Sequence, residues 1–374
     1  MTREKKIRVG VIFGGRSGEH EVSLVSASSI INALDKDKYE VIPIGITPDG
    51  RWLSSANTMS LLKAKSRIEG EPERIIVPEP HRRELVSVEH NAPPEEIDVV
   101  FPIVHGTYGE DGTLQGLLEL ADIPYVGAGV LGSALGMDKV LQKKIFKQED
   151  LPVVKYAWVL SSEVRVQQKK TINVCEKSLR YPMFVKPANT GSSVGITKAH
   201  NRKELMNGLV LAATFDRKII VEEGVKGVRE IECSVLGNDT PIASVPGEII
   251  PGNEFYDYNA KYVDGNSTPV IPADLPKKVV KEIQRLAIRA FRSLDCWGMA
   301  RVDFFVTGRG KVYLNELNTI PGFTSISMYP KLWEASGLAY ADLLDKLITL
   351  AFEMHALKST RATSYSPSSA WYDV

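Results

Sequence analysis

The chain has 374 residues, of which 43% are apolar and 25% charged, and its 46 basic residues balance 46 acidic ones. One hydrophobic core rarely serves a chain of this length, so two or three domains are expected. The balanced charge gives no sign of a broad nucleic-acid or membrane surface, and no apolar run is long enough to span a bilayer. We therefore expect no nucleic-acid partner, no membrane association and a cytoplasmic location. Three widely spaced cysteines argue against a disulfide framework and are expected to be buried thiols.

The N-terminal part of the chain predicts a βαβ unit. Residues 7–15 form an apolar run that ends in glycines, residues 17–34 follow with a helical pattern, and residues 39–46 predict a second strand. A βαβ unit implies a parallel sheet. Residues 54–96 mix charge with proline and predict a peripheral excursion, whereas 97–104 predict a further buried strand.

From about residue 153 the pattern changes to short strands with an interposed helix. Strands are expected within 151–160, 181–187, 193–199, 218–225 and 230–237, and a helix over 202–215. An amphipathic helix is predicted over 277–294, followed by a hairpin at 298–319 and two helical segments. The last residues are rich in Ser, Thr and Pro and predict a flexible tail.

One glycine-rich stretch has the spacing of a dinucleotide-binding loop. VGAGVLG at 126–132 fits G-x-G-x-x-G, and Asp150 follows at about the distance of the usual acidic residue. It stands after the opening βαβ unit has ended, so we disfavour this interpretation. If this stretch did bind a dinucleotide, the protein would be a nucleotide-dependent oxidoreductase, which is the alternative from another class of enzyme.

The hairpin at 298–319 gathers polar side chains that suit a hard cation. Alternation predicts that Arg301, Asp303 and Phe305 share one face of the first strand, and that Leu314, Glu316 and Asn318 share one face of the second. Asp303, Glu316 and Asn318 then supply oxygen ligands of the kind that Mg²⁺ prefers. The alternative is the solvated polar face of an ordinary hairpin.

Three further segments are candidate substrate sites. In FVKPANTGSSVGI, 184–196, Lys186 ends an apolar strand and precedes small residues whose N–H groups can wrap a phosphate; the alternative is a hairpin tip. Glu19 lies near a helix start, where it either binds a substrate ammonium group or complements the helix dipole. The turn at 320–330 offers N–H groups and hydroxyls to a carboxylate or oxyanion, or is an ordinary turn with a helix N-cap.

Taken together, these stretches resemble the D-alanine–D-alanine ligases of the ATP-grasp superfamily. The resemblance covers about residues 5–355 and is carried by eight motifs in order: VIFGGRSGEHEVS, HGTYGEDGTLQG, GSALGMDK, FVKPANTGSSVG, VEEGVKGVREIE, FYDYNAKY, GMARVDFF and NELNTIPGFTSISMYP.

The resemblance implies a fold of mixed α/β and α+β class. It implies an N-terminal parallel-sheet domain of Rossmann-like, pre-ATP-grasp type at 1–127, a central ATP-grasp subdomain at 128–223, a C-terminal ATP-grasp subdomain at 224–357 and a tail at 358–374. The implied reaction is ATP-dependent synthesis of D-alanyl-D-alanine for peptidoglycan through a D-alanyl phosphate. The implied partners are D-alanine, ATP and two Mg²⁺ ions, with Mn²⁺ as a substitute, and the implied assembly is a homodimer.

The resemblance also assigns roles to single residues. Those around ATP are Lys139, Lys186, Ser193, Glu222, Glu223, Val225, Glu230 and Lys261. The metal ligands are Asp303, Glu316 and Asn318. Those of the first D-alanine and the reacting centre are Glu19, His105, Ser192, Tyr262, Arg301 and Gly322, and those of the second D-alanine are Ser325, Ser327 and Met328. One departure from the family pattern is an extra Val228, which bears on the place of Glu230.

Alternatives within and outside the family differ in testable ways. Ligases that make D-alanyl-D-lactate often carry Phe at the position of Tyr262, so tyrosine favours an amine as the second substrate; a D-alanine–D-serine ligase stays open. A non-catalytic nucleotide-binding protein on the same fold is disfavoured because Arg301, Asp303, Glu316 and Asn318 are all present.

Overall fold

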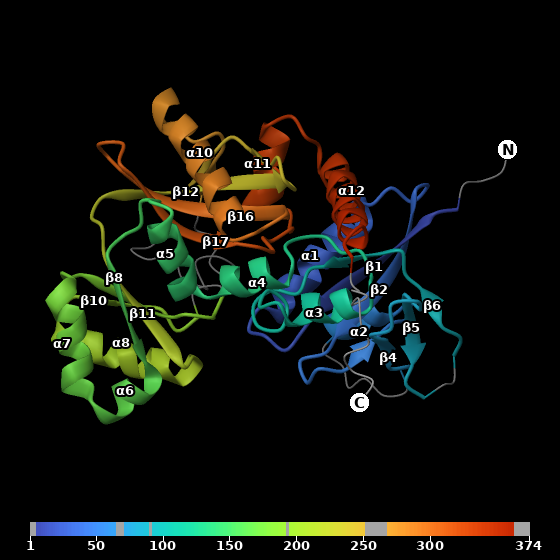
Figure 1. Cartoon of the computed structure of the whole chain (residues 1–374), viewed down its shortest axis with the longest axis horizontal. Helices are drawn as coiled ribbons and strands as arrows, with labels where there is room; N and C mark the ends of the chain where they lie inside the picture. The colour runs from blue at the N-terminus through green and yellow to red at the C-terminus, as the bar shows by residue number, and fades with distance from the viewer. Residues whose placement is uncertain (1–4, 65–70, 90–91, 192–193, 251–267, 363–374) are drawn as a thin grey trace, which may run out of the picture.

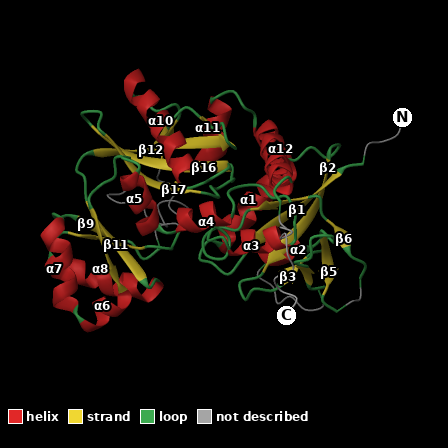
Figure 2. Cartoon of the chain, in the orientation of Figure 1, coloured by secondary structure: helices red, strands yellow, loops and turns green. Residues whose placement is uncertain are grey.

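The structure is a computed structural model of the chain and describes residues 5–64, 71–89, 92–191, 194–250 and 268–362 (Figure 1). Three β-sheets, each with its own helices, follow one another along the chain, and a small fourth sheet lies beside the first. Figure 2 shows the mixture of helices and strands in every part of the molecule.

The first sheet has the order β3-β2-β1-β7. Its strands are β1 (Ile7–Gly14), β2 (Tyr39–Ile46), β3 (Trp52–Leu53) and β7 (Val99–Pro102). β1 is parallel to both β2 and β7, and α1 (His20–Ala33) connects β1 to β2, so the predicted βαβ unit is confirmed. The predicted excursion at 54–96 contains α2 (Thr58–Lys63) and a small antiparallel sheet of β4 (Arg74–Ile76), β5 (Glu84–Ser87) and β6 (Glu95–Glu96).

Three helices lead from the first sheet to the second: α3 (Thr113–Leu120), α4 (Val130–Met137) and α5 (Lys139–Gln148). The glycines of the VGAGVLG stretch have a packing role here. A Cβ on Gly129 would lie 2.0 Å from the Trp297 ring, and one on Gly132 would lie 2.9 Å from the Asp295 carbonyl oxygen. Close approach of the 294–298 segment therefore accounts for these glycines without a bound dinucleotide.

The second sheet is antiparallel, in the order β10-β9-β11-β8. Its strands are β8 (Tyr156–Leu160), β9 (Met183–Pro187), β10 (Thr197–Ala199) and β11 (Lys218–Glu223), and its helices are α6 (Ser161–Val166), α7 (Gln168–Ser178) and α8 (Arg202–Phe215). The predicted helix at 202–215 is confirmed as α8. The sequence did not predict α6 and α7, which help to bury the apolar core of this sheet.

The third sheet is antiparallel and follows the order β15-β14-β12-β16-β17. Its strands are β12 (Val228–Gly237), β13 (Ile242–Ala243, paired with β12), β14 (Gly247–Ile250), β15 (Thr268–Val270), β16 (Gly298–Thr307) and β17 (Val312–Asn318). The predicted amphipathic helix is α10 (Lys277–Ser293), and its residues Ile283, Ala287 and Phe291 are buried in the core beside this sheet.

The predicted hairpin of β16 and β17 is present, but one detail of its alternation is wrong. The register shifts between Asp303 and Phe304, so that Asp303 pairs with Glu316 and Phe304 with Leu314. This β-bulge inserts a residue and changes the side to which following side chains point. Leu314 is therefore buried in the core and does not share a face with Glu316 and Asn318.

The last two helices return to the start of the chain. α11 (Met328–Ala335) packs on the third sheet. α12 (Tyr340–Ser359) contacts β7 and α1 on one side and β16 and β12 of the third sheet on the other, so a late segment, red in Figure 1, packs against an early one, α1, drawn in blue. One apolar cluster contains Val11 and Phe101 from the first sheet together with Leu347 from α12. α12 extends two residues into the segment predicted as a tail.

The cysteines and the long helices also agree with the sequence. Cys175, Cys233 and Cys296 are buried free thiols, as predicted, and burial raises the pKa of each. Within the described ranges, no helix combines the length and apolar character that crossing a bilayer requires.

Candidate active site

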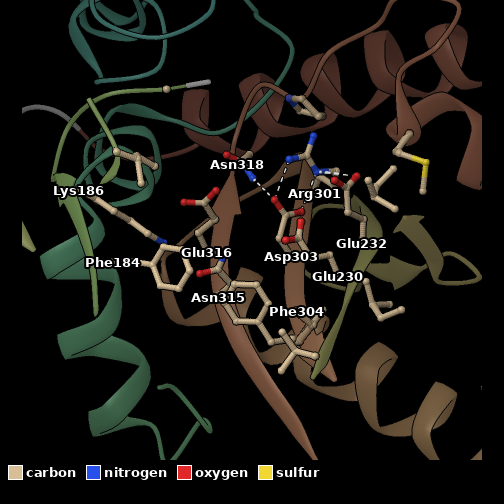
Figure 3. Close-up of a pocket in the computed structure, with 18 of the residues that line it drawn as sticks. Phe184, Lys186, Glu230, Glu232, Arg301, Asp303, Phe304, Asn315, Glu316 and Asn318 are labelled. Carbon is tan, nitrogen blue, oxygen red and sulfur yellow. Dashed lines mark hydrogen bonds and ion pairs between the residues drawn. The ribbon is translucent and has the colours of Figure 1, made fainter. Parts of the chain in front are cut away.

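A cavity of about 820 Å³ lies where the three sheets face one another (Figure 3). It is lined by most of the residues that the sequence singled out: Glu19, His105, Lys139, Lys186, Glu222, Glu223, Val225, Glu230, Arg301, Asp303, Glu316, Asn318, Gly322, Ser327 and Met328. Ser325 is exposed and does not line it. Ser192, Ser193, Lys261 and Tyr262 lie outside the described residues.

At one side of the cavity a buried carboxylate is shared by two lysines. β9 and β11 are antiparallel neighbours, and Glu222 Oε2 lies 2.7 Å from Lys186 Nζ, while Glu222 Oε1 lies 2.8 Å from Lys143 Nζ. Burial opposes the ionisation of Glu222, but the two ammonium groups outweigh it and lower its pKa to about 2. This side of the cavity therefore holds one carboxylate anion between the side-chain nitrogens of two lysines.

Lys143 is a residue that the sequence analysis missed. Its side chain is 2% exposed, and burial lowers its pKa against the opposing effect of Glu222. The signal was its position one helical turn after Lys139, on the same face of α5.

The opposite side of the cavity carries the predicted metal ligands on β16 and β17. Arg301 donates two hydrogen bonds to the Asp303 carboxylate, each 2.7 Å long, and Asn318 Nδ2 donates one of 3.1 Å to Asp303 Oδ2 (Figure 3). Arg301 Nε also lies 3.1 Å from Glu232 Oε2. Burial works against the charge of Arg301, but Asp303 and Glu232 outweigh it and raise its pKa well above the usual value.

The donor set fits a hard cation that also binds phosphate. Glu316 Oε2 lies 3.6 Å from Lys139 Nζ, beyond hydrogen-bonding distance, and Asp303 faces Glu316 across the two strands. Among the described residues, no group of three or more His, Cys, Asp or Glu side chains could hold a metal ion alone. Two carboxylates and one amide therefore suit Mg²⁺ when substrate phosphates complete the coordination.

Glu19 and His105 line the end of the cavity next to the first sheet. Glu19 is 8% exposed, and a Cβ on Gly106 or Gly191 would lie only 2.7 Å or 2.1 Å from Glu19 Oε2. Burial lowers the pKa of His105, so its ring is neutral, and its Nδ1–H donates to the Ile320 carbonyl oxygen at 3.1 Å. The two glycines thus let two loops close tightly around one carboxylate.

Glu110 is a second residue that the sequence analysis missed. Its carboxyl group accepts hydrogen bonds from Gly106 N at 2.7 Å and Ile320 N at 3.1 Å. Burial and the nearby charge of Glu19 raise its pKa to about 8, although the two N–H groups oppose the shift. The signal in the sequence that could have revealed Glu110 was the pair of acidic residues in the polar loop GEDG, residues 109–112. Glu110 joins the wall of the first sheet to the turn after β17.

That turn approaches the helix N-terminus at Ser327. Ser327 Oγ accepts a hydrogen bond from Thr324 N at 3.0 Å and lies 2.8 Å from Thr324 Oγ1. A Cβ on Gly322 would lie 2.8 Å from Ser327 Oγ, so the glycine permits the close approach. Thr324 and Lys331 line the cavity here and were not predicted.

Comparison with known proteins gives the same family at every level. Residues 8–128 match the family model "D-ala D-ala ligase N-terminus", and residues 145–349 match "D-ala D-ala ligase C-terminus". The chain is 52% identical over 365 residues to a "D-alanine--D-alanine ligase" of Natranaerobius thermophilus, covering 97% of this chain and 100% of that protein. A protein of Thermoanaerobacter sp. with the same description is 54% identical over 355 residues, covering 94% and 98%.

Solved structures share the fold as well. The "D-alanine-D-alanine ligase from Coxiella burnetii" superposes with a TM-score of 0.81 at 40% identity, covering 95% of this chain and 96% of that one. The "VanG D-Ala:D-Ser Ligase from Enterococcus faecalis" gives a TM-score of 0.82 at 37% identity, covering 93% and 100%. The chain belongs to the D-alanine–D-alanine ligase family.

Proposed function

We propose that the 820 Å³ cavity is the site at which this protein activates one D-alanine with ATP and joins it to a second. The protein is an ATP-dependent D-alanine–D-alanine ligase, and its product serves peptidoglycan synthesis. The observation that carries the assignment of the site is that one cavity is lined by Glu19, by the Lys186–Glu222 pair and by the Arg301–Asp303 pair.

The nucleotide lies between the second and third sheets in this proposal. Lys186 directs its ammonium group at the phosphates, and the 222–225 segment with Glu230 lines the base and ribose side. Asp303, Glu316 and Asn318 would hold Mg²⁺, or Mn²⁺ in its place, and the bound cation would neutralise charge on the transferring phosphoryl group. Lys139, Ser193 and Lys261 complete the proposed set.

The first D-alanine binds against the first sheet. Its ammonium group pairs with Glu19, beside His105, while Ser192 and Tyr262 belong to the same proposed set. A carboxylate oxygen of this D-alanine attacks the γ-phosphorus, the bond to ADP breaks, and a D-alanyl phosphate forms. A carboxylate becomes an acyl donor only when its oxygen is turned into a good leaving group.

The second D-alanine attacks this acyl phosphate with its amine nitrogen. Ser327 and the Met328 backbone are proposed to hold its carboxylate, whereas Ser325 is exposed and does not line the cavity. Arg301 and the Gly322 N–H stabilise the tetrahedral oxyanion, which then expels phosphate as the peptide bond forms. Water would hydrolyse the acyl phosphate, so the reaction needs the enclosed setting that the tightly packed Gly106 and Gly191 loops support.

The proposal extends to the molecule as a whole. We assign the units 1–127, 128–223 and 224–357 to first-substrate binding, nucleotide binding and catalysis, with 358–374 as a tail. A homodimer and a cytoplasmic location also belong to the proposal.

Incubation with ATP, Mg²⁺ and D-alanine tests the function directly. We expect ADP and D-alanyl-D-alanine in equal amounts, detected by a coupled ADP assay and by mass spectrometry of the dipeptide. L-Alanine is the control and should give neither product. ADP formation that does not depend on D-alanine, or the absence of dipeptide, would contradict the assignment.

D-Serine is the second candidate for the acceptor, because the VanG D-Ala:D-Ser ligase is among the similar structures. Phosphate release with D-alanine plus D-serine or D-lactate, measured across pH, separates the three outcomes. We expect D-alanine to be the best acceptor, and a higher rate with D-serine would overturn this choice.

A further inference from the structure

One face of helix α5 contacts both Glu222, on the proposed nucleotide side of the cavity, and Glu316, on the proposed metal side. Lys139, Gln142 and Lys143 are spaced i, i+3 and i+4, so they lie on the same side of the helix. Asp138 is the N-cap of this helix, and its side chain accepts hydrogen bonds from Val140 N and Leu141 N, each 3.0 Å long. Asp138 also forms an ion pair with Lys218 of β11, which fixes this end of the helix to the second sheet.

The same face of α5 covers the open edge of β17. β17 is the last strand in its sheet. Apart from an isolated bridge between Leu314 and Val153, its outward N–H and C=O groups have no strand partner among the described residues. Gln142 replaces that partner with its amide: its Nε2 donates to the Leu317 carbonyl oxygen at 3.0 Å, and its Oε1 accepts from Leu317 N at 2.9 Å. Both backbone groups of Leu317 are thus held by one side chain.

Lys143 holds the strand on the other side of the metal ligand. Its Nζ donates to the Asn315 carbonyl oxygen at 3.0 Å and lies 2.8 Å from Glu222 Oε1. Asn315 and Leu317 flank Glu316 directly, so Gln142 and Lys143 fix the backbone on both sides of that carboxylate. Gln142 and Lys143 are 2% exposed, so water does not compete for these bonds.

We propose that Gln142 and Lys143 are positioning residues that set where the Glu316 carboxylate stands relative to the Lys186–Glu222 pair. The inference rests on the proposed role of Glu316 as a metal ligand. The helix does more than cover a sheet edge, because Lys143 joins β17, which carries Glu316, to Glu222 on the proposed nucleotide side. Groups that orient metal ligands typically change metal affinity 10- to 100-fold when removed.

The test replaces Gln142 with methionine, which keeps the length of the side chain. It removes both hydrogen bonds to Leu317 and the bond that Gln142 donates to the Gly136 carbonyl oxygen. Mn²⁺ binding in the presence of ADP is measured by electron paramagnetic resonance of the free ion. We expect about 10-fold or greater loss of Mn²⁺ affinity for Gln142→Met. Hydrogen exchange at the Leu317 amide should become faster in this variant, while D-alanine affinity, measured by calorimetry, should stay at the wild-type value.

The control is Lys144→Met, at the next residue of α5, which is exposed and stacks on Trp158. It should bind Mn²⁺ as the wild type does. Gln142→Leu is the second variant in case Gln142→Met does not fold; it also lacks the groups that bind Leu317 and adds no charge beside the proposed cation site, so it should show a loss of affinity in the same direction. Mn²⁺ affinity within about twofold of wild type in a folded Gln142 variant would overturn the inference.

Glu316→Gln in the same assay separates this inference from the proposed site. If Glu316→Gln lowers Mn²⁺ affinity but the Gln142 variants do not, only the positioning role is wrong. If Glu316→Gln binds Mn²⁺ normally, the proposed metal site itself is wrong.

Discussion

Glu316 is the residue at which the proposed metal site meets the phosphate side of the cavity. Its carboxylate faces Asp303 on the neighbouring strand and lies 3.6 Å from the Lys139 ammonium group. Replacing groups that merely orient a metal ligand costs 10- to 100-fold, so loss of a ligand should cost more. We expect Glu316→Gln to lower turnover about 100-fold or more, measured as ADP release at saturating substrates.

The melting temperature of Glu316→Gln should stay close to the wild-type value, because the substitution keeps the size of the side chain. Near-normal turnover in this variant would disprove its role as a metal ligand.

Glu110 should give the folded protein a measurable pH dependence. Burial and the charge of Glu19, opposed by Lys139 and two N–H groups, raise its pKa to about 8 from the ordinary 4.5. The folded state therefore binds this proton more tightly than the unfolded chain. The resulting stabilisation is fully present below pH 4.5 and is lost as the pH rises toward about 8.

Glu110→Gln cannot titrate, so it serves as the reference. We expect the melting temperature of the wild type relative to this variant to fall steadily between pH 5 and about 8. Glu334→Gln, on an exposed position of α11, should run parallel to the wild type. A difference between wild type and Glu110→Gln that is constant over this range would contradict the buried, protonated carboxyl group.

Single site residues differed in how well the sequence revealed them. Glu316 and Asn318 were predictable because both stand in a motif with a chemical reason for oxygen ligands. Lys143 and Glu110 carried only weak signals, a lysine one helical turn after Lys139 and an acidic loop, since their importance comes from contacts with residues distant in sequence, Glu222 and Ile320. The bulge after Asp303 was also invisible, because period-two alternation contains no signal for an inserted residue.

Among the elements, the N-terminus of α4 depends on the absence of one side chain. A Cβ on Gly129 would lie 2.0 Å from the Trp297 ring, although the Gly129 backbone angles suit any residue. Overpacking of this kind costs about 1–3 kcal/mol. We expect Gly129→Ala to lower the free energy of unfolding by that amount, measured by urea denaturation, and Trp297→Leu to restore part of it in the double variant.

Gly116 is the matched glycine on α3, where a Cβ would meet nothing within 4 Å. Gly116→Ala should stabilise the protein by about 0.5–1 kcal/mol, because alanine favours the helix. Destabilisation by both substitutions to the same extent would show that the Trp297 contact is not the cause.

Elements with a strong local pattern were predictable, and those defined by packing were not. β1, α1 and β2 were recognisable from a buried strand, a glycine turn and a helical pattern, and α10 from its apolar stripe. α6 and α7 carry mostly charged and polar residues and become helical where Val164, Ile172 and Cys175 pack on the second sheet. Their helical state thus depends on tertiary contacts.

On the scale of the whole molecule, a nucleotide bound in the cavity contacts two sheets at once and should stabilise their arrangement. A ligand at 100 times its dissociation constant adds about 2.7 kcal/mol to the folded state. We expect a non-hydrolysable ATP analogue with Mg²⁺ to raise the melting temperature by several degrees, measured by differential scanning fluorimetry. Lys186→Met should reduce the shift.

NAD⁺ is the matched control for this experiment, because the VGAGVLG stretch has the spacing of a dinucleotide loop. It should leave the melting temperature unchanged, since Trp297 occupies the space beside Gly129. A shift with NAD⁺ and none with the ATP analogue would reverse the assignment of the nucleotide.

The packing of α12 on the first sheet has a consequence for the growing chain on the ribosome. Val11 and Phe101 belong to one apolar cluster with Leu347 and Ala351, so the first sheet is synthesised more than 200 residues before the helix that helps to bury it. Until that helix leaves the exit tunnel, the nascent sheet exposes apolar surface of the kind that chaperones bind. The core of the first sheet, which is synthesised first, is therefore completed only when α12, near the C-terminus, has been synthesised. The order of translation thus opposes independent folding of the N-terminal unit.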